Sequence, residues 1–332
     1  MPLDRYQWIA FLQTLAVFHH IFLWIIMPFI SLWLPIYVLL FSRFWWVMAA
    51  YFLWYLYDFG TPAKGSRSLA CYKNSPIWNY FADYFPISIV KTSELPPDRN
   101  YLMGCHPHGI LSIGAFTHLC TNATGFSDKF PGLKSTILTL SGQFWFPLRR
   151  EFGIALGGVE SSNKSLRYLL QKPGYGRLIG IVIGGAEEAL DAKPGVHDLN
   201  IMNRRGFCRH AIQMGAYLVP SYSFGENEIF DQKYNARGSP IRKVQTYIKK
   251  QLGFCPPLFT GRGFFSENFG LLPYRKPITT IVGAPISVEK CDNPTLAQID
   301  ALHVRYCESL RELFEEHKAK YGVPENVHLN LL

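Results

Sequence analysis

Residues 15–40 contain no Asp, Glu, Lys or Arg, and this apolar run limits what the chain can fold into more than any other feature. Its length suffices to cross the hydrocarbon core of a bilayer, which is about 30 Å thick. A second apolar, aromatic-rich stretch, residues 44–57, follows Arg43. The two stretches fit either one long bent segment or a hairpin of two helices. The run is too long for a cleaved signal peptide and lacks a small-residue cleavage pattern. We therefore expect residues 1–60 to be a membrane-embedded helical segment or hairpin.

Beyond residue 60 the pattern changes to that of an α/β domain. Short apolar runs bounded by glycine or polar residues predict buried strands, and helical patterns separate them. The clearest helix is the last one, for which Asn293 is the expected N-cap and Pro294 lies in the first turn. Strands alternating with helices predict a mainly parallel or mixed sheet with helices on both faces. The expected strands lie in residues 101–104, 135–140, 178–185, 217–225 and 278–286.

The formal net charge of +9 favours anionic partners, which include phosphate-bearing cofactors, acidic lipid surfaces and nucleic acid. Nucleic acid is disfavoured because the aromatic residues concentrate in the N-terminal segment instead of interleaving with the arginines. The seven cysteines contain no C-x-x-C pair of the kind that zinc sites and redox motifs use. They indicate packing residues in a reduced compartment.

Two histidines, His106 and His108, flank Pro107 and precede Gly109, at the end of an expected strand. The proline disfavours helix and holds the pair extended. Three interpretations fit this spacing: ligands of a metal ion, a hydrogen-bonded turn, or a catalytic base oriented by a carboxylate. The spacing alone does not choose between them.

A second polar group follows the strand expected at 178–185, where Gly184 and Gly185 precede Glu187 and Glu188. Open α/β sheets place their active sites at the carboxyl ends of strands, which makes these carboxylates candidate site residues. The alternative is a solvated acidic start of a helix, which is favourable next to the helix dipole. Both interpretations stay open on this motif alone.

Arginines cluster in two places along the chain. Their planar, forked guanidinium groups suit phosphate, although solvated surface positions explain such clusters equally well. The two clusters are Arg149 with Arg150, and Arg204, Arg205 and Arg209.

Six motifs taken together resemble the animal acyl-CoA:acylglycerol acyltransferase family. Its members include second-type diacylglycerol acyltransferases, monoacylglycerol acyltransferases and wax-alcohol acyltransferases. The resemblance covers nearly the whole chain, and six motifs in order are far more specific than any one. They are HPHG at 106–109, RREF at 149–152, GGAEEAL at 184–190, NRRGFCRHA at 203–211, VPSYSFGENE at 219–228 and LLPYRKPITTIVGAPI at 271–286.

The resemblance implies a catalytic centre at the HPHG motif. His108 is the expected general base, His106 supports the site or contacts substrate, and Glu188 matches the glutamate of the family's G-G-A-x-E pattern. Related phospholipid acyltransferases place an orienting aspartate a few residues after the base, but Ile113 and Gly114 occupy that region here. We therefore expect Glu188 to orient the base.

The remaining expected site residues stabilise the reacting thioester or bind the CoA part of acyl-CoA. Backbone N–H groups near Gly109 and Gly185 are candidates for an oxyanion hole, since glycine leaves room for the tetrahedral carbon. No metal site is expected. The five arginines are expected to bind the phosphates of acyl-CoA: Arg149, Arg150, Arg204, Arg205 and Arg209.

The implied fold is a glycerolipid-acyltransferase-like mixed sheet wrapped by helices, formed by residues 61–332 and facing the cytosol. The implied enzyme is an acyl-CoA:acylglycerol O-acyltransferase that esterifies diacylglycerol to triacylglycerol without an acyl-enzyme. Monoacylglycerol and long-chain alcohols are the alternative acceptors. Acyl-CoA is a co-substrate, and no permanently bound cofactor or nucleic-acid partner is expected.

The expected location is the endoplasmic reticulum membrane, with the lipid-droplet surface as a second location. Two N-x-S/T sequons, at Asn122 and Asn163, would indicate a lumenal domain if they carried glycans. The oligomeric state is open between a monomer and a homo-oligomer. A membrane metal hydrolase and a non-catalytic lipid-surface protein are the competing functions.

Overall fold

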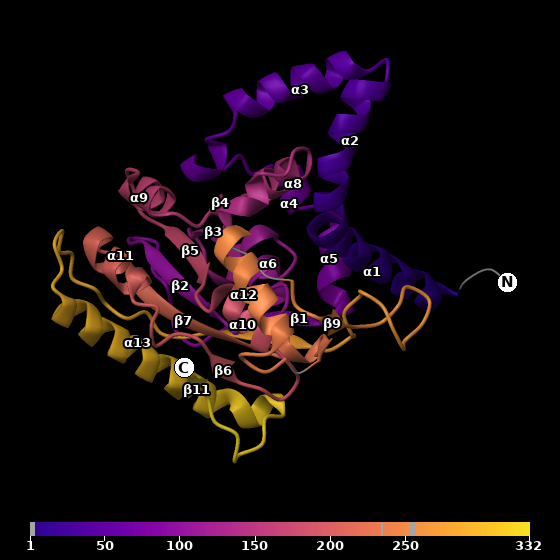
Figure 1. Ribbon diagram of the computed structural model, residues 1–332. Coiled ribbons are helices and arrows are strands. Elements are labelled where there is room, and N and C mark those ends of the chain that lie inside the picture. Colours follow the sequence, from indigo (N-terminus) through magenta and orange to yellow (C-terminus); the bar gives the residue numbers. More distant parts are fainter. Residues whose placement is uncertain (1–3, 234, 253–255) are drawn as a thin grey trace.

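The computed structural model describes residues 4–233, 235–252 and 256–332. Its N-terminal segment contains a long helix and a shorter one that leaves its end at an angle (Figure 1). The long helix, residues 5–41, is long and apolar enough to cross a membrane, judged by length and composition. A turn at residues 42–44 joins it to the shorter helix. The elements are α1 (Arg5–Ile21), the π-helical turn η1 (Phe22–Ile26), α2 (Met27–Phe41) and α3 (Trp45–Tyr57).

The π-helical turn has a local cause in the sequence. Pro28 has no N–H to donate, and its ring crowds the carbonyl group four residues earlier, that of Trp24. Trp24 lies inside the turn, where the wider π-helical winding accommodates the proline. The helix therefore continues through Pro28 instead of ending there.

A mixed sheet of seven strands, in the order β1-β10-β7-β2-β5-β3-β4, forms the centre of the domain. Strands β7, β2, β5, β3 and β4 run parallel, whereas β10 is antiparallel to β7 and β1 is parallel to β10. This confirms the expected mixed α/β sheet, and every predicted strand is present. The strands are β1 (Ile87–Lys91), β2 (Tyr101–His106), β3 (Lys134–Thr139), β4 (Val159–Glu160), β5 (Arg177–Val182), β7 (Tyr217–Phe224) and β10 (Ile278–Val282).

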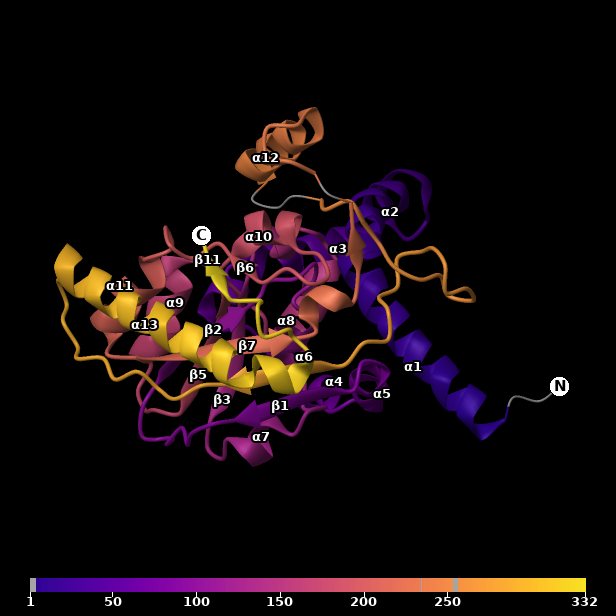
Figure 2. The same ribbon diagram turned by 90° about the horizontal axis from the view of Figure 1, so that it is seen from below.

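Helices cover both faces of the sheet (Figures 1 and 2). One apolar cluster joins the sheet to α1, α5, α6 and α7, and a second joins its other face to α9, α11 and α13. Helix α12 projects away from these layers (Figure 2). The helices of the two layers are α5 (Pro76–Tyr84), α6 (Ile113–Cys120), α7 (Phe126–Lys129), α9 (Asn163–Gln171), α11 (Gly206–Met214) and α13 (Leu296–His317).

Short elements complete the chain. Two small sheets pair β6 with β11 and β8 with β9. The other helices and turns connect the layers. They are α4 (Ala70–Lys73), α8 (Arg149–Ala155), α10 (Gly185–Asp191), α12 (Pro240–Leu252), η2 (Thr61–Lys64), η3 (Ser141–Phe144), η4 (Glu226–Glu228), η5 (Lys318–Tyr321), β6 (Asp198–Leu199), β8 (Asp231–Gln232), β9 (Phe259–Thr260) and β11 (Asn330–Leu331).

Helix α13 was predicted, but its start differs from the prediction. The N-cap is Thr295 instead of Asn293, because Thr295 and Gln298 form a reciprocal capping box. Further along α13, the buried Tyr306 reaches strand β2. A Cβ atom at Gly104 of β2 would lie 1.9 Å from the Tyr306 hydroxyl, so this strand position requires glycine.

Candidate active site

Three neighbouring parallel strands, β7, β2 and β5, each end in titratable residues. Glu226 follows β7, His106 and His108 lie at the end of β2, and Glu188 follows β5 on α10. Because these strands run in the same direction, their carboxyl ends share one edge of the sheet. The edge thus gathers two histidines and two carboxylates that are far apart in sequence.

His108 is half-buried in this group, and its ring has a defined tautomer. Its Nδ1 atom lies 3.0 Å from the carbonyl oxygen of Gly109. A carbonyl oxygen can only accept, so Nδ1 carries the proton and Nε2 keeps a free lone pair. Burial lowers the pKa of His108 below its ordinary value, which keeps the imidazole neutral near pH 7. The ring therefore has the form that a general base requires.

Glu188 contacts the main chain of His108. Its side chain is 2% exposed, Oε1 accepts a hydrogen bond from the His108 N–H, and Oε2 accepts one from the Asn200 N–H at 3.0 Å. Burial raises the pKa of Glu188 to about 7. The sequence predicted that Glu188 orients the imidazole itself; the structure has it binding the histidine through the backbone.

Glycines leave room for this carboxylate. A Cβ atom at Gly184 would lie 1.9 Å from Oε2 of Glu188, so the position admits only glycine beside the carboxylate. Gly185 has φ of +63°, which L side chains rarely adopt, and the Arg204 guanidinium lies 4.0 Å from where its Cβ would be. Glycine is thus favoured at the two positions for different reasons. At Gly184 the reason is the close approach of the Glu188 carboxylate, and at Gly185 it is the backbone conformation.

Sequence reasoning missed Glu226. This carboxylate is 1% exposed and accepts hydrogen bonds from the N–H groups of Ile113 (2.7 Å) and Gly114 (2.8 Å) at the start of α6. Burial raises the pKa of Glu226 to about 7. A signal was available, because Glu226 follows its strand through a glycine much as Glu188 does. It was hidden because sequence does not show which strands are neighbours.

His106 lies inside the protein. It is 1% exposed, and its Nε2 atom lies 3.1 Å from the Tyr306 hydroxyl on α13. Burial lowers the pKa of His106 to about 3, so the ring is neutral across the physiological range. Through this contact His106 links the end of β2 to α13.

The arginines of the RREF motif have partners inside the protein. The Arg149 guanidinium stacks over the Trp24 ring at 4.2 Å and donates to the carbonyl oxygens of Gln143 and Leu23. Arg150 is fully buried; its Nη2 donates to the Asp58 carbonyl at 2.9 Å and lies 3.3 Å from the Asp58 carboxylate. Both guanidinium groups therefore join α8 to the N-terminal helices.

The second arginine cluster is exposed at the start of α11. Arg204 lies nearest the site, beside Gly185, and its charge acts to lower the pKa of Glu188 against the larger effect of burial. Arg205 is partly engaged, because its Nη1 lies 2.9 Å from Asp300. Arg209 is exposed one helical turn further on. These three side chains can reach an anion in solvent.

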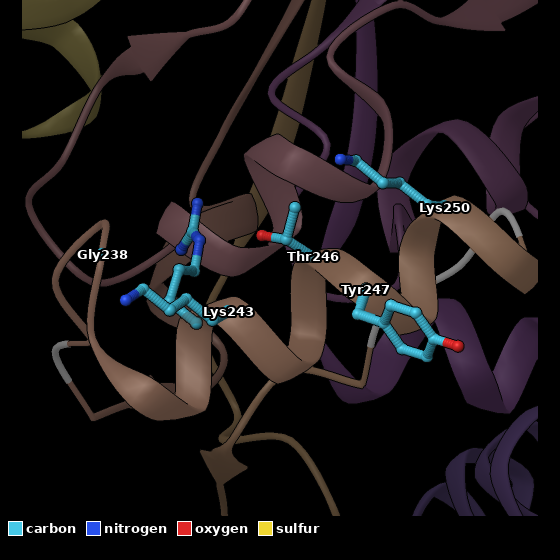
Figure 3. A pocket seen from close by; sticks show the side chains of 6 residues that line it. Gly238, Lys243, Thr246, Tyr247 and Lys250 are labelled. Atoms are coloured by element: carbon cyan, nitrogen blue, oxygen red, sulfur yellow. The ribbon is translucent and has the colours of Figure 1, made fainter.

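A pocket of about 280 Å³ lies along α12, from which Lys243, Thr246, Tyr247 and Lys250 project (Figure 3). Arg242 also lines it and connects it to α10 through Glu187, with Nη2 2.7 Å from Oε1. The adjacent acidic residues of α10 thus point differently: Glu187 toward α12 and Glu188 toward His108.

Within residues 4–233, 235–252 and 256–332, no three His, Cys, Asp or Glu side chains are grouped to hold a metal ion.

Comparison with known proteins gives consistent matches. The model of the family described as diacylglycerol acyltransferase matches residues 37–332. 2-Acylglycerol O-acyltransferase 1 of Bos taurus is 47% identical over 315 residues, which are 95% of this chain and 94% of that protein. Diacylglycerol O-acyltransferase 2 of Rattus norvegicus is 47% identical over 282 residues, 85% of this chain and 73% of that protein. A solved 1-acyl-sn-glycerophosphate acyltransferase, PlsC from Thermotoga maritima, aligns with a TM-score of 0.39 and 11% identity over 91% of this chain and 97% of that one.

Proposed function

The chain belongs to the diacylglycerol acyltransferase family and is an acylglycerol O-acyltransferase; from this premise we propose that it transfers an acyl group from acyl-CoA to the free hydroxyl of diacylglycerol. One observation carries the proposal: a neutral imidazole with a free Nε2 lies at the carboxyl edge of the sheet, held by a buried carboxylate. Acyl-CoA is the co-substrate. A thioester is already activated, so the reaction needs neither an acyl-enzyme nor a permanently bound cofactor.

In the proposed reaction His108 acts as the general base. Its Nε2 takes the proton of the acceptor hydroxyl as the oxygen attacks the thioester carbonyl, forming a tetrahedral intermediate. The intermediate collapses by breaking the C–S bond, and the imidazolium returns the proton to the departing CoA thiolate. The products are the ester and CoA. General-base assistance of this kind contributes about 10² to 10⁴ in rate.

Glu188 and the glycines prepare the site for that step. Glu188 holds the His108 backbone, while Gly109 N–H and Gly185 N–H are proposed to face the developing oxyanion. Donors placed in advance stabilise the intermediate at no cost of reorganisation during the reaction. His106 supports the strand end through Tyr306.

Binding of acyl-CoA is proposed to use the arginines at the start of α11. Arg204, Arg205 and Arg209 are exposed near the carboxyl edge of the sheet, and forked guanidinium groups suit phosphate. Arg149 and Arg150 are engaged inside the protein, so we no longer assign the phosphate contact to them.

The cellular arrangement is also a proposal. Residues 1–60 would be embedded in the endoplasmic reticulum membrane, and residues 61–332 would face the cytosol, where acyl-CoA is available. Lipid droplets are the second proposed location. Acylglycerols partition into lipid, so a site beside the membrane receives them by lateral diffusion. A homo-oligomer is compatible with this arrangement.

Monoacylglycerol is the second candidate acceptor. It is favoured by the 2-acylglycerol acyltransferase relative, which aligns over 95% of this chain, against 85% for the diacylglycerol acyltransferase of the rat.

The test is an assay of membranes containing the protein with labelled oleoyl-CoA and three separate acceptors: diacylglycerol, monoacylglycerol and a long-chain alcohol. Triacylglycerol as the main product supports the proposal. Preferential acylation of monoacylglycerol or alcohol would move the acceptor to that class, and no ester from any acceptor would contradict acyl transfer.

A further inference from the structure

Glu226 is a buried carboxylate that the reaction described above does not use. It begins the turn η4, one glycine after the end of β7, and is 1% exposed. Its two oxygens accept hydrogen bonds from the N–H groups of Ile113 and Gly114, 2.7 and 2.8 Å away. Burying a carboxylate is unfavourable unless hydrogen bonds satisfy it. The position therefore needs a reason beyond filling space.

Two glycines of the segment from Gly109 to Gly114, which follows His108, pack closely against this carboxylate. A Cβ atom at Gly109 would lie 2.7 Å from Cγ of Glu226, and one at Gly114 would lie 3.1 Å from Oε2. Gly109 also has φ of +58°. The segment that follows His108 is thus shaped around Glu226 at both of its glycines.

The same segment holds the ring of His108. The Gly109 carbonyl accepts the hydrogen bond from Nδ1, and Ser112 returns to His108 by donating both its N–H (3.1 Å) and its hydroxyl (2.9 Å) to the His108 carbonyl. Ser112 has φ of +53°, a left-handed conformation that is unfavourable for a non-glycine residue. Such a conformation persists where surrounding contacts hold it. Glu226 supplies those contacts at the next two residues, Ile113 and Gly114.

We propose that Glu226 is a positioning residue of the active site, whose carboxylate fixes the turn from Gly109 to Gly114 and so directs Nε2 of His108 toward the acceptor hydroxyl. The inference rests on the proposed function, in which His108 is the base. The backbone around His108 is then held between two carboxylates. Glu188 binds it from the β5 side and Glu226 from the β7 side. Burial raises the pKa of both glutamates in the same way.

The test replaces Glu226 with residues of nearly equal size. Glu226→Gln keeps one acceptor oxygen and turns the other into an NH₂ group that faces a backbone N–H. Glu228→Gln is the matched control, because Glu228 lies on the same turn and also accepts a backbone N–H, that of Gly195 at 2.8 Å. Full-length variants are purified in detergent, and kcat, KM for both substrates and the thermal midpoint are measured.

A positioning role predicts a loss in kcat with substrate binding retained. We expect Glu226→Gln to lower kcat at least about tenfold, since small displacements of a catalytic group are costly, with KM within about twofold of the wild type. Glu228→Gln should leave both constants within about twofold. A purely structural role would lower the thermal midpoint without this division between kcat and KM.

Several outcomes would overturn the inference. One is folded Glu226→Gln enzyme with kcat reduced less than about tenfold, and another is an effect confined to KM. If neither Glu226→Gln nor Glu226→Asp accumulates as folded protein, Glu226 serves stability alone and the inference fails. His108→Ala in the same series separates this result from the proposed function: an active His108→Ala would contradict the base itself, whereas an inactive one beside an active Glu226→Gln contradicts only the positioning role.

Discussion

Glu187 and Glu188 are adjacent in α10 but face opposite surroundings. Glu188 is buried, and burial raises its pKa to about 7. Around Glu187 the effect of burial is outweighed by hydrogen bonds from Lys249 and Arg242, so its pKa lies below the ordinary value. In the folded state Glu188 is therefore protonated more easily than an ordinary glutamate, and Glu187 is ionised more easily.

This contrast predicts opposite effects on stability as pH changes. A raised pKa means that the folded state holds its proton more tightly, so the contribution of Glu188 is present below about pH 4.5 and lost as pH rises through about 7. The full span corresponds to about 3 kcal/mol. Glu188→Gln should therefore gain thermal midpoint relative to the wild type as pH rises from 5 to 8.

Glu187→Gln is the matched control for that measurement. The pKa of Glu187 is lowered, so its contribution is present at neutral pH and is lost on acidification. The variant should be less stable than the wild type at pH 8 and approach it at low pH. Parallel behaviour of the two variants would contradict the assigned environments.

Gly184→Ala tests the contact between Glu188 and His108. The added Cβ would overlap the Glu188 carboxylate and displace it from the His108 N–H. We expect kcat to fall about 100-fold, the size of effect that a displacement of about 1 Å produces. Gly174→Ala is the control, because its φ is +88° but nothing lies within 4 Å of the new Cβ. It should cost about 1 kcal/mol of stability and leave kcat unchanged; an equally active Gly184→Ala would argue against the contact.

At the residue scale, sequence could predict the site where a motif marked it. His108, Gly109 and Glu188 were predicted as site residues from motifs that follow expected strands and from the family resemblance, and the structure brings them to one edge of the sheet. Glu226 was not found, since its relation to them depends on the order β7-β2-β5, which no local pattern contains. The role of Glu188 at the backbone of His108 likewise depends on geometry across two strands.

At the scale of elements, α8 and α11 separate two kinds of arginine that look alike in sequence. On α8, Arg150 is buried with Asp58 of the N-terminal region. At the start of α11, Arg204 is exposed next to the site. Burial could not be predicted here, because the helix that covers Arg150 comes from a segment far away in sequence.

The difference predicts separable consequences. Arg150→Ala removes a fully buried guanidinium that donates to Asp58, while Arg67 and Thr61 remain as partners of the Asp58 carboxylate, so we expect a cost of about 1–3 kcal/mol of stability. Arg204→Ala should leave the thermal midpoint unchanged and raise KM for acyl-CoA, because it removes the proposed phosphate contact. The measurement is KM for acyl-CoA beside the thermal midpoint for each variant. A raised KM in folded Arg150→Ala, or none in Arg204→Ala, would reverse the assignment of the two clusters.

Helix α13 shows how element boundaries escape local patterns. Its apolar residues recur with helical spacing; Ile299, Tyr306 and Leu310 of this face are buried, whereas Leu296 in the first turn is exposed. Its start was misplaced by two residues because Asn293 and Thr295 are both good N-caps. Gln298, three residues after Thr295, decides between them by completing the capping box.

At the scale of the whole molecule, the N-terminal helix is part of the domain and not only an apolar extension. Arg275 donates to Gln13 Oε1 at 2.6 Å and to the Ala10 carbonyl at 3.0 Å, and α1 packs on α5 in the first apolar cluster. His19 contacts Tyr72 at 3.0 Å. In the proposed membrane arrangement, a segment attached so closely would hold the domain at a fixed position relative to the bilayer.

The proposed orientation can be tested with the two sequons. Asn122 and Asn163 are both exposed, so either could accept a glycan in the lumen of the endoplasmic reticulum. A cytosolic domain predicts that both remain unmodified and that endoglycosidase does not change the mobility of the protein. A glycan on either residue would place the domain on the other side of the membrane.

The central claim is that His108 is the base of acyl transfer, and its most direct test is the turnover of His108→Ala. His210→Ala is the control, because His210 is also a buried histidine, and its hydrogen bond, to Asn163, involves neither His108 nor the two glutamates that hold its backbone segment. Ester formation from acyl-CoA and acylglycerol is measured per amount of folded protein. We predict a loss of at least about 100-fold for His108→Ala and near wild-type turnover for His210→Ala. Wild-type turnover by folded His108→Ala would contradict the account.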